Sequence, residues 1–501
     1  MNDPFFARTK SKKSKKATNN KEKNKIVTGK KRKFEANDDE ESIPSSEDEV
    51  GPGLIDDMDM EHNFSEEDDE EAHETPAEKR RRLAKQYIDS VREDLDEAGF
   101  DAAEIDRDLI GQRLRKEALE ASGRLHRELA NAFKFPIDPS KIKSRRHELS
   151  VTCVATTDSA QFFYTGSKDG TVKKWDIKTG KKLHVFPGGR KELKEYDGHN
   201  NVVLALAVSS DGKYLASGGA DKKINIWSVQ DNTLMTCFKQ HKEGITGLAF
   251  RKGSNQLYSA SNDRTIKLWN VDEKGYIETL FGHQDQITAI DTLARERCVT
   301  VGGRDRTCRL WKIVEESQLV FRSGSKTEKD DKAHQEGCLD AIALIDEEHF
   351  LSGSDSGAIS LWSVQKKKPI FVYDIAHGTQ ITNSESQSHL SPSHWIISLA
   401  TLRYSDVFAS GSWDGNIRLW KLTNNIHSFE PLTKIPIIGF VNSLQFTTVE
   451  QDSKPNETTR ATTTLLIAGV GQEHKFGRWE RIKKARNGWR MIELPLINVT
   501  S

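Results

Sequence analysis

The sequence lacks the features that would define a secreted, membrane-spanning or disulfide-rich protein. Its 501 residues contain no run of about 18 apolar residues, so no membrane-spanning helix is predicted. The N-terminal stretch MNDPFFARTKSKKSKK has no apolar segment of signal-peptide length, which argues against secretion. The five cysteines form no CxxC pair and are odd in number, which is typical of reduced thiols inside a cell and argues against a zinc finger.

Net charge is also almost absent, at −1, but this sum conceals charged blocks. Residues 1–33 carry 13 basic and 2 acidic side chains, whereas residues 34–78 carry 20 acidic and no basic ones. Residues 79–133 carry 12 of each, and the remainder has 50 basic and 42 acidic side chains. The block charges are therefore more informative about partners than the mean charge.

Residues 1–75 are predicted to be a disordered tail, first basic and then acidic, because they contain too few apolar residues to offset the entropy of ordering. The basic cluster Lys30, Lys31, Arg32 and Lys33 is a candidate nuclear-import signal, the alternative being a solvated basic tail. The acidic part is either a target of an acid-directed kinase or a spacer that shields basic surface.

Residues 76–133 are predicted to form a short helical arm. Thr75, Pro76 and Glu78 make a helix start, and apolar residues then recur at intervals of three and four. The arm either packs on the following domain or docks on partners or RNA. We favour docking, because the arm is too small to hold a core of its own.

One spacing rule dominates the rest of the chain. Four histidines are each followed 22 residues later by an aspartate and 28 residues later by a tryptophan. The sets are His147, Asp169 and Trp175; His199, Asp221 and Trp227; His241, Asp263 and Trp269; and His283, Asp305 and Trp311. A fifth unit starts at His334 with Ser356 and Trp362, and weaker units follow with Asp414 and Trp420 and with Glu473 and Trp479. Tryptophan intervals of 42 match the WD40 period, and longer intervals add loop insertions.

Each unit reads as four short strands of alternating apolar residues, which form one blade of a propeller. The fold class is therefore all-β: a seven-bladed WD40 β-propeller over residues 139–496. Within a blade we expect a hydrogen-bonded tetrad of His, hydroxyl, Asp and Trp, with Thr165, Ser217 or Ser259 four residues before the Asp. Blade 4 is predicted to lack the hydroxyl, having Val301, and blade 7 has Glu473 and no matching histidine.

Two segments compete to supply the outer strand of blade 7. Residues 487–496 follow Trp479 at the distance where other blades place that strand. Alternatively, residues 139–146 supply it and close the ring. Because the His, Asp and Ser set recurs in blade after blade, we interpret it as structural and predict no enzyme, no cofactor, no metal site and no small-molecule substrate.

Several phrases exceed the general WD pattern: SSDGKYLASG (209–218), NQLYSASNDRTIKLWNV (255–271) and, above all, AGVGQEHKFGRWERIKKARN (468–487). On these phrases the chain from about Thr75 resembles the WD-repeat protein family specific to the U3 small nucleolar ribonucleoprotein. The resemblance implies a nuclear, nucleolar protein that binds U3 snoRNA at its box B/C region. It would do so beside the small kink-turn-binding protein, with other box C/D and small-subunit processome proteins, in pre-rRNA processing.

Basic residues on the turns and on the seventh blade are compatible with this. The RNA-contact candidates are Lys222, Lys223, Arg304, Arg306, Lys475, Arg478, Arg481, Lys483, Lys484 and Arg486, with Trp395 and Trp413 for base stacking. The competing hypothesis is a nuclear WD40 adaptor that reads peptides or histones or delivers substrates to a ubiquitin ligase.

Overall fold

The computed structural model describes residues 127–137, 142–189, 198–322, 337–379, 393–423, 426–450 and 462–495. All of them belong to the compact unit Asp94–Ser501, and the other unit, Met1–Glu93, contains no described residue. The predictions for the tail, for the import cluster and for residues 76–126 of the arm therefore lie outside the described residues. In the described residues, no helix is long and apolar enough to cross a membrane.

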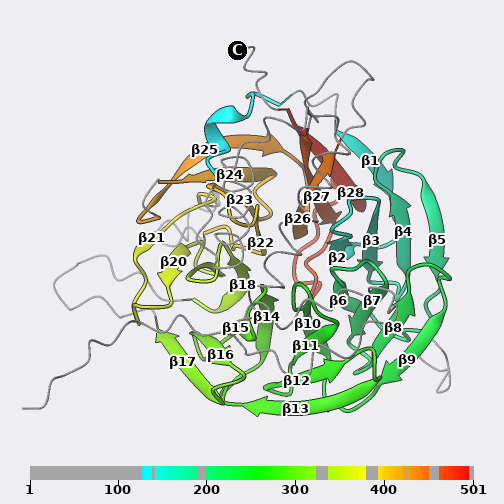
Figure 1. The fold of residues 1–501 in the computed structure, drawn as a ribbon. Helices are drawn as coiled ribbons and strands as arrows, with labels where there is room; N and C mark the ends of the chain where they lie inside the picture. The colour runs from blue at the N-terminus through cyan, green and yellow to red at the C-terminus, as the bar shows by residue number, and fades with distance from the viewer. Residues whose placement is uncertain are drawn as a thin grey trace, which may run out of the picture. The chain divides into compact units, whose positions relative to one another are not determined.

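The described chain forms seven four-stranded antiparallel sheets arranged as blades in a ring (Figure 1). Blade 1 contains β2 (Val151–Thr156), β3 (Phe162–Ser167), β4 (Val172–Asp176) and β5 (Lys182–Phe186). Blade 2 contains β6 (Val203–Val208), β7 (Tyr214–Gly219), β8 (Ile224–Ser228) and β9 (Leu234–Phe238). Blade 3 contains β10 (Ile245–Phe250), β11 (Gln256–Ser261), β12 (Thr265–Asn270) and β13 (Gly275–Phe281).

Blade 4 contains β14 (Ile287–Thr292), β15 (Arg297–Gly302), β16 (Thr307–Lys312) and β17 (Ser317–Arg322). Blade 5 contains β18 (Leu339–Leu344), β19 (His349–Ser354), β20 (Ile359–Ser363) and β21 (Phe371–Tyr373). Blade 6 contains β22 (Ser398–Thr401), β23 (Val407–Gly411), β24 (Asn416–Leu422) and β25 (Phe429–Pro436). The prediction of a seven-bladed β-propeller is confirmed.

Blade 7 is built from both ends of the described chain. Its inner three strands are β26 (Phe440–Glu450), β27 (Thr462–Gly471) and β28 (Gly488–Leu494), and its outer strand is β1 (Lys143–Arg146). β1 pairs antiparallel with β28, with Lys143 opposite Met491 and Arg146 opposite Gly488. Of the two alternatives, the segment before His147 thus supplies the outer strand, and residues 488–494 form the third strand.

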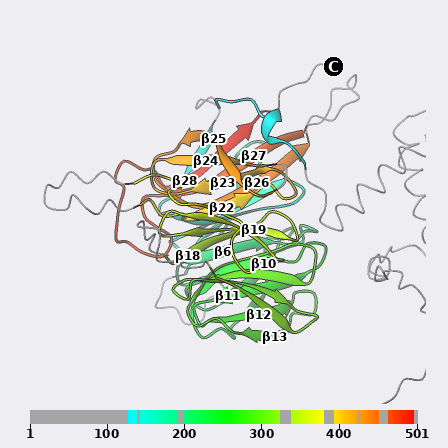
Figure 2. The ribbon, with the colours of Figure 1, turned by 90° about the vertical axis from the view of Figure 1, so that its left-hand side faces the viewer.

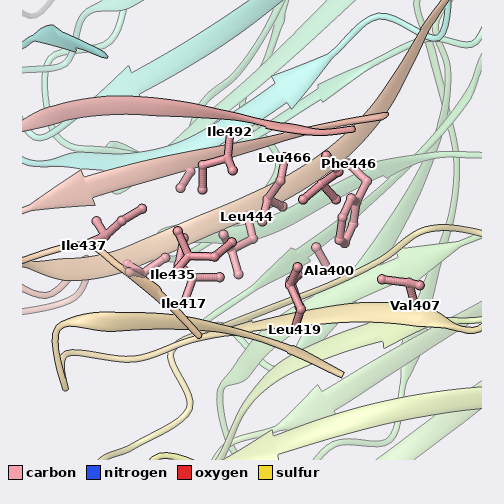
Figure 3. Close-up of a cluster of buried hydrophobic side chains, with 14 of the residues drawn as sticks. Ala400, Val407, Ile417, Leu419, Ile435, Ile437, Leu444, Phe446, Leu466 and Ile492 are labelled. Atoms are coloured by element: carbon pink, nitrogen blue, oxygen red, sulfur yellow. The ribbon is translucent and has the colours of Figure 1, made fainter. Parts of the chain in front are cut away.

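The hydrophobic core is divided among the junctions between blades. The buried apolar residues form seven clusters, one between each pair of adjacent sheets. Figure 3 shows the cluster between blades 6 and 7, where Leu419 and Ile435 face Leu444 and Leu466. Because no blade has a core of its own, each blade depends on its two neighbours.

The inner strands carry a further contact that sequence patterning does not reveal. In six of them the pairing register with the second strand shifts at one bulged residue, and a bulge re-aims a side chain. Polar side chains at this position and at Ser398 in blade 6 bond a carbonyl of the next blade at five of the seven junctions. The donors and acceptors are Thr152 to Val203, Thr246 to Ile287, Thr288 to Leu339, Ser398 to Val441 and Asn442 to Val151. Leu204 and Asp340 hold the position at the two remaining junctions.

The tetrad is complete in blades 2, 3, 4 and 6. In blade 3 His241 lies 2.9 Å from Asp263 and 2.7 Å from Ser259, whose hydroxyl also accepts the Trp269 indole N–H at 2.9 Å. The equivalent contacts in blade 2 join His199 to Asp221 and Ser217, and Trp227 to Ser217. Although burial alone would raise it, the hydrogen bonds from His241 and Thr265 hold the pKa of Asp263 below its usual range.

Blade 4 corrects one prediction. Thr300, one residue before Val301, supplies the hydroxyl: it lies 2.8 Å from His283 and accepts the Trp311 N–H at 2.8 Å. His283 also lies 2.8 Å from Asp305. The hydroxyl is five residues before the aspartate here, because the segment Gly302–Gly303 adds one residue after it.

The predicted contact between His147 and Asp169 in blade 1 is also wrong. Thr165 bonds His147 at 3.1 Å and Trp175 at 2.8 Å, but the carboxylate of Asp169 accepts from Thr171 and not from His147. Nδ1 of His147 has no hydrogen-bond partner among the described residues. Burial, with the nearby charge of Lys173, lowers the pKa of His147 to about 4.

Blade 6 has a tetrad histidine that the spacing missed. His377 lies 2.7 Å from Ser410 and 3.0 Å from Asp414, and Trp420 donates to Ser410. His377 stands 37 residues before Asp414, so 15 residues more separate them than the 22 of the other blades. Blade 5 keeps the Trp362 to Ser352 bond, and its predicted histidine, His334, lies outside the described residues.

The prediction for blade 7 was wrong in its tryptophan. Trp479 is 58% exposed and lies in the connection between β27 and β28, whereas Trp489 on β28 is the buried indole of this blade. Trp489 packs edge-on against Trp175 and Phe163 of blade 1. The third strand of blade 7 is therefore the one that carries Trp489, and not the segment before Trp479 that the tryptophan spacing indicated.

The last described residues of the arm pack on the propeller. Leu129 and Ala130 donate their backbone N–H groups to the carboxylate of Asp406, in the turn between β22 and β23, at 2.7 and 3.1 Å. Only η2 (Ala130–Ala132), a single 3-10 turn, is helical here, so the predicted α-helix does not extend through 127–133. This segment, cyan in Figure 2, lies beside blades 6 and 7, where Phe133 enters their shared cluster.

The ring closure predicts how truncations behave. Removal of residues 1–75 should change the melting temperature by no more than a few degrees, because no described strand lies there. Removal of 1–146 also deletes β1 and leaves β28 as an edge strand, and should lower the melting temperature by at least about 5 °C. Removal of 1–137 retains β1 but deletes the packed segment 127–137, and so separates the contribution of that segment from the contribution of β1. Equal melting curves for the 1–75 and 1–146 deletions would contradict this account of closure.

The two aspartates Asp263 and Asp169 provide a matched test of the tetrad. Asp263→Ala removes the partner of a buried imidazole, whereas Asp169→Ala removes only the partner of Thr171. Asp263→Ala should therefore cost about 1–3 kcal/mol more free energy of unfolding. Superimposable denaturant curves for the two variants would show that the histidine link contributes nothing.

The lowered pKa of His147 predicts a pH dependence of stability. The imidazole titrates near 6.5 in the unfolded chain and near 4 in the folded protein, so protons bind the unfolded chain first as the pH falls. Between pH 7 and pH 5 this residue should cost the folded state about 2 kcal/mol. In urea titrations, the difference in free energy of unfolding between the wild type and His147→Gln should fall by that amount from pH 7 to pH 5. A difference that does not change with pH would refute this role of His147.

Candidate nucleic-acid interface

The topology places one set of connections on one side of the ring. Within each blade the four strands alternate in direction, so the connections between second and third strands all leave at the same end. The connections from one blade to the next leave at this end too. We call this side the bc rim, and the side that carries the first-to-second and third-to-fourth turns the opposite rim.

The bc connection of blade 7, residues 472–487, is much longer than the others. Its base is fixed by two amide side chains: Gln472 donates to the carbonyl of Ala485 at 2.8 Å, and Asn487 accepts the N–H of Gln472 at 2.8 Å. The ammonium of Lys168, in the bc turn of blade 1, bonds Glu473 at 3.2 Å and the carbonyl of Gly477 at 3.0 Å. The loop is therefore attached to the neighbouring blade as well as to its own.

An aromatic cluster supports this loop. The buried His474 ring lies 5.0 Å from Trp479 and 6.0 Å from Trp395, which precedes blade 6, and Trp395 lies 6.0 Å from Trp413 in the bc turn of that blade. Burial, with the charges of Lys475 and Lys168, lowers the pKa of His474 to about 3, so the imidazole is neutral at physiological pH. The exposed Trp479 is the outermost ring of this cluster.

The basic residues predicted in the loop occupy three different environments. Lys483, Lys484 and Arg486 are exposed. Arg478 lies 3.1 Å from Glu473, and Arg481 donates to Gln472 at 2.8 Å. Lys475 differs from both groups.

Lys475 turns toward the inner strands. It interacts electrostatically with Asp340 on β18 and with Cys153 on β2, which belong to the inner strands of two different blades. Burial lowers the pKa of Lys475, and burial raises the pKa of Asp340 to about 6, although each charge opposes the shift of the other. This lysine and this aspartate therefore lie close enough for their charges to interact, an arrangement that the sequence does not reveal.

The bc turns of blades 2, 3 and 4 carry the other predicted basic residues. Lys222, Arg264 and Arg306 follow the tetrad aspartates and have φ of 69°, 67° and 53°, in the left-handed region. In blades 1, 5 and 6 glycine holds the same position, at φ of 81° to 85°. Left-handed backbone costs a residue with a side chain roughly 1–2 kcal/mol. In blades 2, 3 and 4 an exposed basic side chain therefore lies on the bc rim despite the unfavourable backbone conformation. Arg304 is also exposed on this rim, and Lys223 is half-buried.

No group of three or more His, Cys, Asp or Glu side chains in the described ranges is placed to hold a metal ion. In the complete tetrads the imidazoles are buried between a hydroxyl and a carboxylate. Four-stranded blades, tetrads and a ring closed by both chain ends define the class of the protein: it is a seven-bladed WD40 β-propeller, here with a basic bc rim.

Comparison with known proteins narrows this class. Residues 132–311 match the family model described as "Nucleolar protein 10-like, N-terminal domain", and residues 384–421 match "WD domain, G-beta repeat". The chain is 45% identical over 428 residues to "U3 small nucleolar RNA-interacting protein 2" of Mus musculus, covering 85% of this chain and 84% of that protein. It is 32% identical over 568 residues to "Ribosomal RNA-processing protein 9" of Saccharomyces cerevisiae, covering 92% and 98%.

A solved structure agrees with these relatives. The "Structure of U3-55K" is 42% identical and superimposes with a TM-score of 0.63 over 72% of this chain and 100% of that chain. The chain belongs to the family of WD-repeat proteins of the U3 small nucleolar ribonucleoprotein. The resemblance inferred from the loop phrase 468–487 is confirmed.

Proposed function

We propose that this protein is a non-enzymatic RNA-binding scaffold that contacts U3 snoRNA through the bc rim, in the box B/C region and beside the kink-turn-binding protein. It acts, with other box C/D and small-subunit processome proteins, in pre-rRNA processing for the small ribosomal subunit in the nucleolus. The relatives named as U3 snoRNA-interacting and rRNA-processing proteins support the particle and the pathway. The observation that carries the proposal is the long basic loop 472–487 on the rim that also bears the strained basic turns.

Two kinds of side chain on the bc rim bind the RNA, basic ones and aromatic ones. Exposed Lys483, Lys484 and Arg486 neutralise phosphates, which supplies most of the sequence-independent affinity. Trp479, with the rings of Trp395 and Trp413 behind it, offers a stacking surface for an unpaired base. Folded RNA is recognised by such a combination of shape, backbone contact and stacking.

Catalysis is not part of the proposal. A triad-like arrangement that repeats from blade to blade stabilises each blade, and its histidines are shielded from any substrate. The proposal accordingly includes no cofactor, metal or small-molecule substrate. Nuclear import through Lys30, Lys31, Arg32 and Lys33 stays a prediction, since these residues lie outside the described ones.

Replacement of Lys483, Lys484 and Arg486 by glutamine tests the loop. The variant should keep its melting temperature, because the three side chains are exposed. It should bind U3 snoRNA more weakly, and the slope of log affinity against log salt should become shallower by about 0.7–0.9 for each lost phosphate contact. The measurement is a salt titration of binding to isolated U3 snoRNA in the presence of the kink-turn protein.

The matched control is Lys366, Lys367 and Lys368 changed to glutamine. These three exposed lysines lie in the turn between β20 and β21, on the opposite rim, so their loss should leave the salt slope nearly unchanged. Equal slopes for both variants would overturn the assignment of RNA to the bc rim. Capture of peptides or histone tails without any selective RNA binding would favour the adaptor hypothesis instead.

A further inference from the structure

A second feature of the bc rim lies on blade 3, outside the long loop. An open hollow of about 500 Å³ occurs where β12 begins, β13 ends and the chain passes into His283. This volume is within the range of small-ligand sites, about 300–1,000 Å³. Its lining combines the three basic residues Lys242, Arg264 and Lys267, polar Gln240, Asn262, Thr265 and Thr279, and one aromatic residue, Phe281.

The strand register explains why these side chains meet. Thr265 pairs with Phe281, and Lys267 pairs with Thr279, so all four project from one face of the sheet. Nearer the other end of the same face, Trp269 is buried in the cluster between blades 2 and 3. The face is thus apolar and packed at one end, and polar and open at the bc rim.

Phe281 is the unusual member of this face. Its side chain is 70% exposed, although neighbouring Leu280 contacts the core between blades 3 and 4. The equivalent residue of blade 2, two positions before the tetrad histidine, is Lys239. An exposed phenylalanine contributes little to the stability of the blade, and its ring is available at the mouth of the hollow.

The charges around the ring are predominantly positive. Arg264 is exposed and sits in the left-handed backbone region that glycine occupies in blades 1, 5 and 6. Lys242 is exposed, and Lys267 donates to Thr279 at 2.7 Å. Of the two acidic residues in the lining, Asp263 is engaged by His241 and Thr265, which leaves Glu243.

We propose that this hollow is a second RNA subsite, which takes one unpaired nucleotide: Phe281 stacks on the base, and Arg264 and Lys242 hold the flanking phosphates. The inference rests on the proposed function and extends it to blade 3. An aromatic face beside cations is the combination with which proteins hold single-stranded nucleic acid. An acidic peptide would use the cations equally well but would not require a planar ring.

Three variants of the full-length protein test the subsite on isolated U3 snoRNA. Phe281→Ala should lower affinity roughly 5- to 150-fold, as expected for the loss of one base–aromatic stack, with the salt slope unchanged. Phe281→Trp should retain the affinity because it retains a stacking face. Arg264→Gly should keep or slightly raise the melting temperature, because glycine suits φ of 67°, yet make the salt slope shallower by about 0.7–0.9.

The control is Val314→Ala, which shortens an apolar side chain that is 75% exposed in the turn between β16 and β17, on the opposite rim. It should bind RNA like the wild type. If Phe281→Ala binds RNA as tightly as the wild type, the assignment of an RNA subsite to this hollow is wrong. If the variant of Lys483, Lys484 and Arg486 still binds RNA more weakly than the wild type, the proposed function stands without the blade 3 subsite. If neither this variant nor Phe281→Ala loses RNA affinity, both the proposed function and the subsite are refuted.

A peptide arm distinguishes the other occupant. A synthetic peptide of residues 34–78, which carries 20 acidic and no basic side chains, serves as the probe. If Arg264→Gly weakens peptide binding while Phe281→Ala leaves RNA binding intact, the hollow belongs to acidic protein segments and the nucleotide site is refuted. Weakened RNA binding with an unchanged, salt-sensitive peptide interaction supports it.

Discussion

The structure depends on the pairing of β1 with β28, which joins the two ends of the propeller in one sheet. Each hydrophobic cluster lies between two blades, so a ring opened between blades 7 and 1 would expose the apolar faces of both blades. The bulged residues of the inner strands add side-chain bonds to carbonyls of the next blade at five junctions. Closure therefore fixes the positions of all seven bc connections, and the basic rim exists only because the ring is closed.

The two rims serve different purposes. The opposite rim receives residues 127–137, which bond Asp406 and fill the junction of blades 6 and 7. The bc rim carries features that cost stability: a long loop in place of a tetrad in blade 7, basic residues in left-handed turns, and exposed Trp479 and Phe281. Departures from the most stable blade that gather on one side of a scaffold are typical of a binding surface.

Much of this architecture is predictable from the sequence, because the tetrads require fixed distances along the chain. The regular 22- and 28-residue spacings identified blades 1 to 4 and the full tetrads of blades 2 and 3 correctly. The errors occur where a residue is inserted or a partner changes: the extra glycine after Thr300, the insertion before Asp414 that hid His377, and the loop that separates Trp479 from Trp489. Spacing also could not show that Asp169 bonds Thr171, or that Lys475 turns inward, since both depend on side-chain direction. The hollow beside Phe281 arises from strand register, which pairs residues 12 and 16 positions apart.

Cross-linking of the full-length protein to U3 snoRNA, with the linked residues identified by mass spectrometry, tests the central claim most directly. The account predicts cross-links within 472–487 and at the bc turns around Lys222, Arg264 and Arg306. It predicts none at Lys366 to Lys368 or within 127–137, which lie on the opposite rim. Cross-links concentrated on the opposite rim, with the bc rim unmodified, would contradict it.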